Sequence, residues 1–234
     1  MTDIHTHILP GIDDGAADRE ISLMLLLQES ESGVNNIIFT PHFHPERQNV
    51  EKFCEKREAA KETLLYFLED LSPQLQWKMG AEVFYSTRLF EILPEKLAIQ
   101  GTPYILLEFS THMQPVMADH LFFEWRMQGF IPIIAHVERY PYVRNNMKLL
   151  ENWTEAGALI QVNAGSILGK GETARFVKKA IRRELVHLVA SDTHSPDTRP
   201  ANMVSALKRL PRKKAEELVR NGDDVFEGKR IDIL

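Results

Sequence analysis

Short apolar runs alternate with longer helix-like stretches along almost the whole chain of 234 residues. The runs are rich in Ile, Val and Leu, as strands buried on both faces of a parallel sheet usually are. The expected strands are 2–5, 36–40, 76–82, 104–108, 131–136, 158–162 and 187–191. Strands that alternate with helices predict an α/β fold with parallel pairing and right-handed crossovers.

The stretches between these runs have the capping residues and apolar spacing of helices. Asp18 is a candidate N-cap for a helix that ends near Gly33, and Gly129 and Gly157 stand where helix C-caps belong. Further helices are expected at 50–70, 115–128, 147–155, 172–183, 200–209 and 211–220. No Gly-rich dinucleotide loop follows the first strand. A closed or nearly closed (β/α) barrel, formed by one domain over residues 1–234, is therefore expected rather than a doubly wound sheet.

Charge and composition exclude several classes of function. The net charge of −5 leaves no basic footprint for nucleic acid or an anionic membrane. No apolar run approaches the roughly 18 residues of a membrane span, and the N-terminus has no signal-peptide pattern, so we expect a cytoplasmic protein. The single cysteine, Cys54, lies in a helix-like stretch. This excludes an internal disulfide, a thiolate metal cluster and a cysteine-nucleophile phosphatase.

Histidines and carboxylates follow the expected strands, and barrel enzymes carry their chemistry at the carboxyl ends of strands. His5 and His7 are two residues apart on a strand, so both can bind one ion from the same face. The strand ends and the loops that follow them offer as candidates His5, His7, Asp14, His42, His44, Glu82, Glu108, His136, Glu138, Asp192 and His194. Imidazole and carboxylate ligands suit Mn²⁺, Fe or Zn²⁺ and predict a metal-dependent hydrolase.

Three neighbouring residues leave alternatives open. Asp13 competes with Asp14 for the metal role, and we expect Asp13 to be a loop or cap residue. His44 is expected in a loop or outer shell. Asn163 could orient a metal ligand or make an ordinary hydrogen bond at a strand end. His187 begins a strand and is not expected to bind metal.

Several segments resemble the PHP (polymerase and histidinol phosphatase) superfamily. They are 3–15, 40–42, 105–109, 134–139 and 190–194. Within that superfamily they resemble the bacterial manganese-dependent protein tyrosine phosphatases of capsule and exopolysaccharide loci. The chain departs modestly from the pattern at 136–139, where His-Val-Glu-Arg replaces the commoner His-Pro-Glu-Arg.

The resemblance implies a distorted (β/α)7 barrel with three divalent ions, Mn²⁺ before Fe or Zn²⁺. It assigns His5, His7, Glu82 and Asp192 to the first ion; Glu82, Glu108 and His136 to the second; and Asp14, His42 and His194 to the third. Arg139 and Arg199 match arginines that bind phosphate in the family, since a guanidinium fork fits phosphate oxygens. The loop that carries Arg199 is the more variable of the two.

The resemblance also implies a function and a partner. The expected reaction is hydrolysis of phosphotyrosine on a bacterial tyrosine kinase, at its C-terminal tail, in the control of polysaccharide synthesis. The alternatives are a small-molecule phosphoesterase of the histidinol-phosphatase type, a metal-stabilised binding module without catalysis, and a barrel amidohydrolase. The complete set of candidate ligands argues against the binding module.

Overall fold

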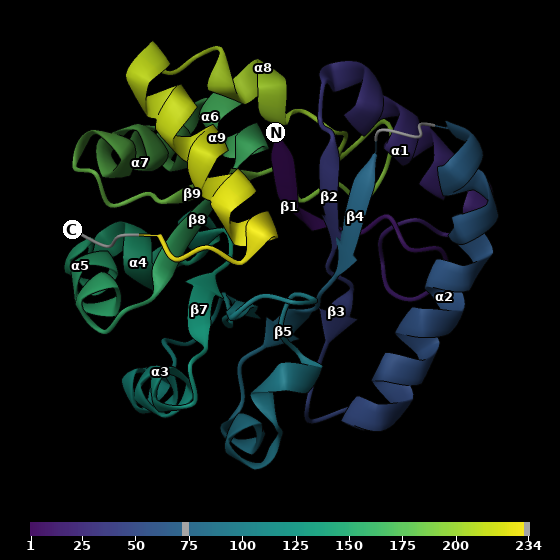
Figure 1. Cartoon of the computed structure of the whole chain (residues 1–234). Helices are drawn as coiled ribbons and strands as arrows, with labels where there is room; N and C mark the ends of the chain where they lie inside the picture. The colour runs from purple at the N-terminus through teal and green to yellow at the C-terminus, as the bar shows by residue number, and fades with distance from the viewer. Residues whose placement is uncertain (72–74, 232–234) are drawn as a thin grey trace.

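The computed structural model describes the backbone of residues 1–71 and 75–231, and the side chains of those residues except 66–71. It confirms an α/β fold with parallel strands (Figure 1). The strands are β1 (Thr2–Thr6), β2 (Asn36–Phe39), β3 (His42–Phe43), β4 (Gln76–Met79), β5 (Glu82–Phe84), β6 (Tyr104–Glu108), β7 (Ile131–Ile134), β8 (Leu159–Asn163) and β9 (Leu188–Ala190).

The strands form two parallel groups, in the orders β1-β2-β4 and β3-β5-β6-β7-β8-β9. The groups meet where β1 pairs with the segment that follows β9. There the N–H of Asp192 donates to the carbonyl of His5 at 3.0 Å, and the N–H of His7 donates to the carbonyl of Thr193 at 2.9 Å. The sheet therefore curls, and its first strand lies beside its last.

Two of the expected strands, 36–40 and 76–82, are interrupted. Pro41 separates β2 from β3, because a proline has no N–H to donate to a neighbouring strand. Gly80 separates β4 from β5, and a Cβ there would lie only 3.3 Å from side-chain atoms of Ile38 and Ile99. Each interruption moves the chain from the first strand group to the second, and His42 and Glu82 begin the two new strands.

Helices cover the outside of the curled sheet (Figure 1). The longer ones are α1 (Arg19–Ser32), α2 (Val50–Leu71), α3 (Ala118–Met127), α5 (Lys148–Glu155), α7 (Gly171–Arg182) and α9 (Arg212–Glu227), and the short α8 (Met203–Leu207) precedes α9. Asp18 caps α1 by accepting from the N–H of Ile21 at 3.0 Å, and Gly33 ends it in the left-handed region, as expected. The expected starts of α3 and α8 were wrong by three residues, because Pro115 and Pro200 lie in the preceding loops.

Short helical turns escaped the sequence analysis because each is only one or two turns long. They are α4 (Pro141–Asn145), α6 (Ala164–Leu168), η1 (Thr87–Glu91), η2 (Pro94–Lys96) and η3 (Val137–Arg139). Helix α9 was expected to end at residue 220 but continues to Glu227. Its last turns bury Val225 and Phe226.

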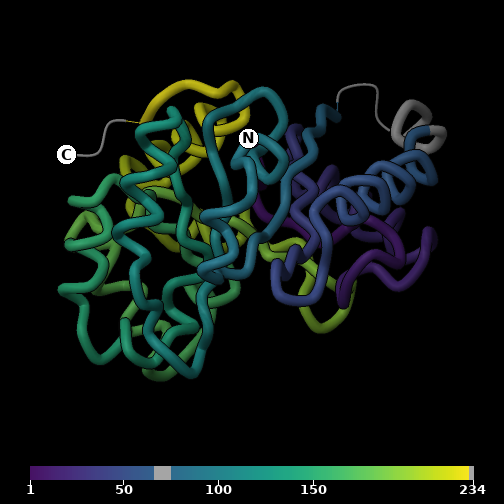
Figure 2. The backbone as a smooth tube through the Cα atoms, turned by 90° about the horizontal axis from the view of Figure 1, so that it is seen from below, coloured from purple at the N-terminus to yellow at the C-terminus, as the bar shows by residue number. Residues whose placement is uncertain are grey.

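Helix α9 closes one end of the curled sheet. Val225 and Phe226 pack with residues that point inside the ring of strands, such as Ile4 and Leu106. The hydroxyl of Tyr104 donates to the carbonyl of Lys229 at 2.6 Å, which ties the end of α9 to the start of β6. Figure 2 shows this C-terminal segment, in yellow, along one edge of the molecule. The carboxyl ends of the strands lie at the opposite end.

In the part of the chain that the structure describes, no helix has the length and apolar character to cross a membrane.

Candidate metal centre

The carboxyl ends of the strands bring all nine predicted ligands into one cluster. Six of them are buried: His5, His7, Glu82, His136, Asp192 and His194. His42 and Glu108 are half-buried, and Asp14 is exposed at the rim. Three overlapping groups of these side chains have ligand atoms within 4.8 Å of one another, which is close enough for one ion in each group.

The first group is the one that the family resemblance implies: His5, His7, Glu82 and Asp192. Nε2 of His5 lies 3.0 Å from Nε2 of His7, so the two rings converge on one point. Oε2 of Glu82 lies 3.1 Å from Nε2 of His5 and 3.0 Å from Nε2 of His7. Ligand atoms that bind one ion at about 2.0–2.2 Å are separated by distances of this size.

The second group consists of His42, Glu82 and Glu108. Nδ1 of His42 lies 3.1 Å from Oε2 of Glu82 and 3.8 Å from Oε2 of Glu108. His136, which the resemblance implies in place of His42, lies beside this group, with Nε2 2.6 Å from Oε1 of Glu82 and 3.8 Å from Oε1 of Glu108.

The third group contains the expected Asp14, His42 and His194, together with His7. Oδ1 of Asp14 lies 3.2 Å from Nε2 of His42 and 3.6 Å from Nε2 of His194. The ring of His7 stacks against that of His194, with centroids 3.9 Å apart. His7, His42 and Glu82 therefore each belong to two of the three groups, a sharing that sequence spacing does not reveal.

Asp13 lies behind the cluster and binds the outer side of a ligand. Its Oδ2 lies 2.7 Å from Nδ1 of His7 and also accepts from the N–H of His42 at 3.0 Å. The turn that permits this contact requires Gly15, because a Cβ there would lie 2.2 Å from the carbonyl oxygen of His7. Of these two neighbouring acids, Asp14 therefore faces the cluster, and Asp13 supports a ligand from behind.

Two of the candidate ligands have strained backbones. His136 has φ of 31° and Asp192 has φ of 55°, in the left-handed region that non-glycine residues avoid. Such strain costs about 1–3 kcal/mol per residue and persists only where neighbouring contacts enforce it. Its occurrence at two residues of one cluster indicates a functional site.

A buried amide pair supports these two strained ligands. Oε1 of Gln161 accepts from the N–H of His136 at 2.6 Å, and its Nε2 donates to Oδ1 of Asn163 at 2.9 Å. Nδ2 of Asn163 then donates to Oδ2 of Asp192 at 2.6 Å. Sequence analysis left the role of Asn163 open and missed Gln161. The sequence signal that could have identified Gln161 is its position as an uncharged polar residue inside the otherwise apolar run 158–162.

Arg139 and Arg199 reach the same edge of the cluster from two different loops. Nη1 of Arg139 lies 3.3 Å from Oδ2 of Asp192, and Nη2 of Arg199 contacts the same oxygen. Both guanidinium groups are partly exposed. They can therefore rearrange toward an anion at the mouth of the site.

The carboxylates give the cluster a negative potential. Burial alone would lower the pKa of His7, but the Asp13 and Glu82 carboxylates raise it to about 10. Burial and the charge of Glu82 raise the pKa of Glu108 to about 7. Burial and the nearby His7 lower the pKa of His194 to about 3. The raised pKa values of His7 and Glu108 indicate that the carboxylates favour positive charge here, whereas the His194 ring is neutral, which is the form of imidazole that binds a metal.

Unsatisfied buried atoms show that the cluster fits metal ions. Oε2 of Glu82, Oδ1 of Asp192 and Nε2 of His194 are buried and make no hydrogen bond among the described residues. A buried polar atom without a partner costs about 1–3 kcal/mol. All three atoms belong to the groups that could hold an ion, and a bound cation would satisfy them.

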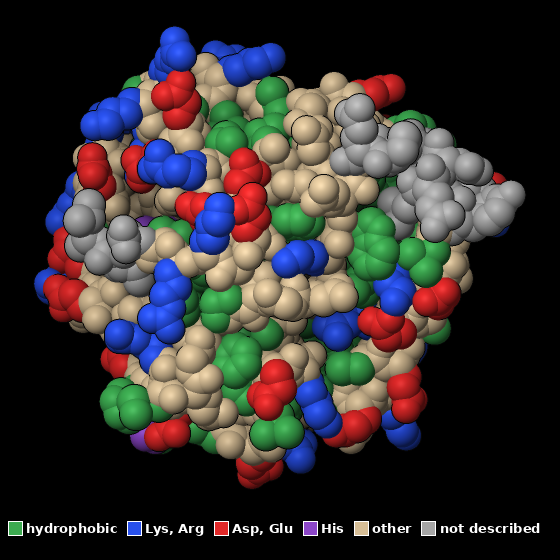
Figure 3. Space-filling model, in the orientation of Figure 1, with side chains coloured by type: hydrophobic (Ala, Val, Ile, Leu, Met, Phe, Trp, Pro, Cys, Tyr) green, Lys and Arg blue, Asp and Glu red, His purple; other side chains and the backbone are tan. Residues whose placement is uncertain are grey.

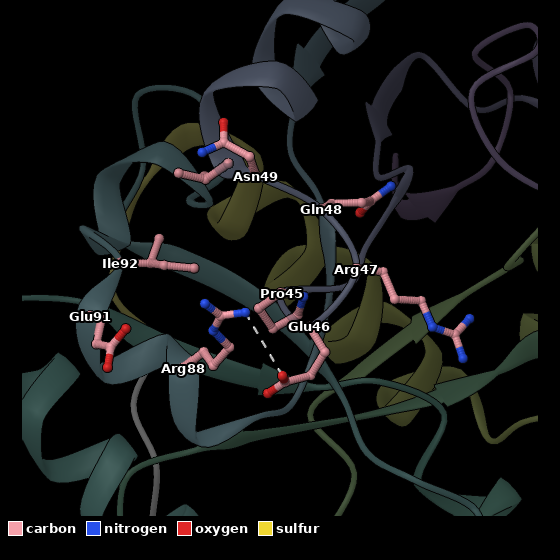
Figure 4. Close-up of a pocket in the computed structure, with 9 residues that line it drawn as sticks. Pro45, Glu46, Arg47, Gln48, Asn49, Arg88, Glu91 and Ile92 are labelled. Carbon is pink, nitrogen blue, oxygen red and sulfur yellow. Dashed lines mark ion pairs between the residues drawn. The ribbon is translucent and has the colours of Figure 1, made fainter.

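A pocket of about 380 Å³ lies in the loops that follow β3 and β5, the strands of His42 and Glu82 (Figure 4). Nη1 of Arg88 lies 3.9 Å from Oε2 of Glu46 across the two loops, and Arg47 points away from this pair. His44 stands just outside the pocket and stacks on Phe84 at 4.5 Å, so it takes no part in the cluster.

Fold and cluster together define a hydrolase-type α/β protein with a candidate multinuclear metal site. The family model for capsular polysaccharide synthesis proteins, CpsB/CapC, matches residues 1–223. The chain belongs to this family, which confirms the capsule-locus family expected from the sequence segments.

Curated relatives agree with this assignment. Tyrosine-protein phosphatase CpsB of Streptococcus pneumoniae is 35% identical, over 93% of this chain and 94% of that protein. Tyrosine-protein phosphatase YwqE of Bacillus subtilis (strain 168) is 34% identical, over 93% of this chain and 87% of that protein.

Solved structures extend the similarity to the fold. A chain from the crystal structures of YwqE from Bacillus subtilis and CpsB from Streptococcus pneumoniae, described as unique metal-dependent tyrosine phosphatases, matches with a TM-score of 0.87. That match is 31% identical and covers 100% of this chain and 97% of the other. An inactive dihydroorotase-like domain from Chaetomium thermophilum matches at a TM-score of 0.59 with 9% identity, over 99% of this chain and 80% of that one, and shows the fold alone.

Proposed function

We propose that this protein is a metal-dependent protein tyrosine phosphatase. The observation that carries the proposal is the convergence of nine imidazole and carboxylate side chains, three of them with unsatisfied buried ligand atoms. The similarity to CpsB and YwqE supports the same reaction and a phosphotyrosine-containing protein as substrate.

The finer assignment follows the three groups. We infer three divalent ions, with Mn²⁺ as the first candidate and Fe or Zn²⁺ as alternatives, because the ligands are imidazoles and carboxylates only. His5, His7, Glu82 and Asp192 would hold one ion. Glu82, Glu108, His136 and His42 would hold another, and Asp14, His42, His194 and His7 the third. Bound divalent ions lower the pKa of water to about 7 and neutralise phosphate charge.

The protein's own residues have three tasks in this reaction. Glu82 lies in two ligand groups, so it would help to hold two of the ions. Asp13, Gln161 and Asn163 orient the ligands from behind. Arg139 and Arg199 stand at the open edge, where their forks can bind the non-bridging oxygens of the phosphate. We name no general acid, because a phenol with a pKa of about 10 leaves readily.

We also infer the number of strand positions in the curled sheet. If β2 with β3, and β4 with β5, are each counted as one interrupted strand, the curled sheet has the seven positions of a distorted (β/α)7 barrel. We further infer that the chain is one domain over residues 1–234. The substrate we infer is the C-terminal tail of a bacterial tyrosine kinase that controls capsular polysaccharide synthesis, in keeping with the family to which the chain belongs.

The test is phosphate release from a phosphotyrosyl peptide by chelated protein, with and without added Mn²⁺. A phosphoseryl peptide, histidinol phosphate and the His5→Ala variant are the comparisons. The proposal expects manganese-dependent release that favours phosphotyrosine and is lost in the variant. Turnover of histidinol phosphate alone would assign a small-molecule phosphoesterase instead. Tight metal binding without any turnover would indicate a binding module.

A further inference from the structure

A second pocket lies between α6, α7 and the α8–α9 junction, outside the metal cluster, with a volume of about 610 Å³. Its walls carry the exposed cations Lys170, Lys178, Arg182 and Arg209. Among the residues that the structure describes, no acidic one lines it. Ile167 and Ile181 are buried below these cations, at 3% and 7% exposure, and give the pocket an apolar base.

Positive charge is concentrated around this pocket although the whole chain is acidic. Residues 167–183 and 208–214 contain eleven of the 28 Lys and Arg but one of the 33 Asp and Glu, in a chain of net charge −5. Figure 3 shows blue side chains gathered at the upper left, over the region where Figure 1 places α7, α8 and α9. A local field of this kind attracts anionic ligands.

The pocket cations have no acidic partner among the described residues, a property that they share with Lys179, Lys208 and Lys213 nearby. Arg183 pairs with Glu151, Arg212 with Glu216 and Lys214 with Glu217. Among the described residues, Lys170, Lys178, Arg182 and Arg209 make no ion pair and no side-chain hydrogen bond. The charges that face the pocket are therefore available to an external anion.

The shape of the pocket favours a peptide over a lipid surface. Membrane-surface binding requires apolar and aromatic side chains that protrude, but within 167–183 and 208–214 Leu168 is the single exposed large hydrophobic residue, at 36%. The other apolar groups are recessed between the cations. A small free anion would leave this apolar base unused. An acidic peptide with one apolar side chain would use both features.

Short helices connect the pocket to the metal centre. Asn163, whose amide contacts Asp192, directly precedes α6, and the five residues of this helix lead to Leu168 at the pocket. Helix α8 likewise follows the loop of Arg199. At about 1.5 Å per residue, α6 spans about 7.5 Å. An extended peptide rises about 3.3 Å per residue, so about three residues span the length of α6.

We propose that this pocket binds an acidic segment of the phosphoprotein substrate, a few residues from the phosphotyrosine. The inference rests on the proposed function. The segment places an apolar side chain against Ile167 and Ile181 and its carboxylates among Lys178, Arg182 and Arg209. Its role is to lower KM for substrates that carry such a segment, without contact with the reacting phosphate.

The test compares two phosphotyrosyl peptides with the manganese-loaded protein. In the acidic peptide, the segment Glu-Leu-Glu-Asp lies four residues from the phosphotyrosine, and versions with the segment before and after the phosphotyrosine are both measured. In the neutral peptide, Gln-Leu-Gln-Asn takes the place of this segment. We expect about tenfold higher kcat/KM for the acidic peptide, through KM, which corresponds to about 1.4 kcal/mol. The K178E/R182E variant should lose this preference and should hydrolyse p-nitrophenyl phosphate as the unchanged protein does.

The matched control is K179E/K213E, which makes the same change of charge at exposed residues of the same two segments that do not line the pocket. It should keep the preference. Equal losses in both double variants would show general electrostatic attraction and overturn the proposal, and so would equal kcat/KM for the two peptides. Binding of anionic vesicles that is lost in K178E/R182E, without any peptide preference, would overturn it in favour of lipid.

Direct binding separates this proposal from the proposed function. Fluorescence anisotropy of the unphosphorylated acidic peptide should show binding that K178E/R182E abolishes and K179E/K213E retains. That result without phosphotyrosine turnover would remove the phosphatase function and leave an acidic-peptide pocket. Turnover of both peptides without such binding would keep the function and remove the pocket.

Discussion

Nδ1 of His7 lies 2.7 Å from Oδ2 of Asp13, and the same oxygen accepts a hydrogen bond from the backbone of His42. This single carboxylate therefore orients one ligand ring and the start of the strand that supplies another. A proton held on Nδ1 leaves Nε2 of His7 free to face the cluster. Asp13 is thus the supporting acid of two ligand groups.

Replacement of Asp13 by Asn should weaken the site without removing a ligand. The amide keeps the shape but loses the charge that fixes the His7 tautomer, so we expect about a 10- to 100-fold loss of metal affinity or activity. Metal titration and phosphotyrosyl peptide hydrolysis measure the two effects. D18N is the matched control, because Asn is as good an N-cap as Asp for α1. Equal behaviour of D13N and the unchanged protein would show that the contact has no role.

Glu82 is the residue whose loss should affect the centre most. Burial alone would raise its pKa, but the surrounding histidines hold the pKa well below the usual value, so Glu82 is ionised and shared between two ligand groups. E82Q should lower kcat by about a thousandfold or more, because it removes a charge from two ion sites. Bound metal per chain, measured by elemental analysis, should also fall. E91Q, an exposed change outside the cluster, should alter neither quantity, and full metal content in E82Q would contradict the shared role.

Arg139 and Arg199 should act through geometry as well as charge. R139K and R199K keep a positive charge but lose the planar fork that binds two phosphate oxygens. We expect kcat/KM to fall by about 10- to 100-fold in each, or about 1.4–2.7 kcal/mol. Steady-state kinetics with a phosphotyrosyl peptide test this, with R220K on α9 as the control. Unchanged kinetics in both variants would place the phosphate elsewhere.

Metal removal should destabilise the folded protein, since the ligands are brought together into a cluster only in the folded state. A metal at a hundred times its Kd contributes about 2.7 kcal/mol per site. For a chain of this size, chelation should therefore lower Tm by about 5–10 °C per site occupied. Thermal unfolding with EDTA and with excess Mn²⁺ measures the shift. H5A, which lacks one ligand, should show a smaller shift, and equal shifts would indicate binding outside the cluster.

His187 should make stability fall in mild acid, apart from the metal centre. Burial lowers its pKa to about 4, and its Nδ1 accepts from the N–H of Ile160 at 3.0 Å, so the ring is neutral in the folded protein. In the unfolded chain the pKa of His187 is about 6.5, so the unfolded chain binds a proton at a higher pH than the folded protein does. Its contribution to the free energy of unfolding is complete above pH of about 6.5 and decreases by up to about 3 kcal/mol toward pH 4.

H187N tests this effect, because an Asn oxygen can also accept the bond from Ile160. Denaturant unfolding of chelated protein between pH 7 and about 4 should show a weaker pH dependence in H187N than in the unchanged protein. H120N, on the exposed side of α3, is the control and should leave the dependence unchanged. The same slope in all three proteins would mean that His187 is not responsible.

Local sequence was enough to predict most strands and helices. Runs such as 104–108 and 131–136 are apolar and bounded by turns, and the cap at Asp18 and the glycine at residue 33 define α1. The ligand types could be predicted because parallel strands place their carboxyl ends at one edge. The grouping into three ions came from the family resemblance and not from spacing.

Tertiary structure decided what depends on contacts between distant residues. Pro41 and Gly80 each interrupt a strand, but only the packed sheet shows that both breaks move the chain between strand groups. Gln161 looks like a misplaced polar residue until its bonds to His136 and Asn163 are seen. Helix α9 runs on past residue 220 to the left-handed cap at Gly228, and only the packed structure shows that its last turns are buried through Val225 and Phe226.

The sequence by itself determined the parallel α/β class, because this depends on local periodicity, and its residue chemistry predicted the ligand types. The tertiary structure decided which acid faces the cluster and which supports it, that His7 and His42 are shared between groups as Glu82 is, and where the basic segments form a pocket. These depend on side-chain directions fixed by packing between segments far apart in the chain, and no local pattern encodes such directions.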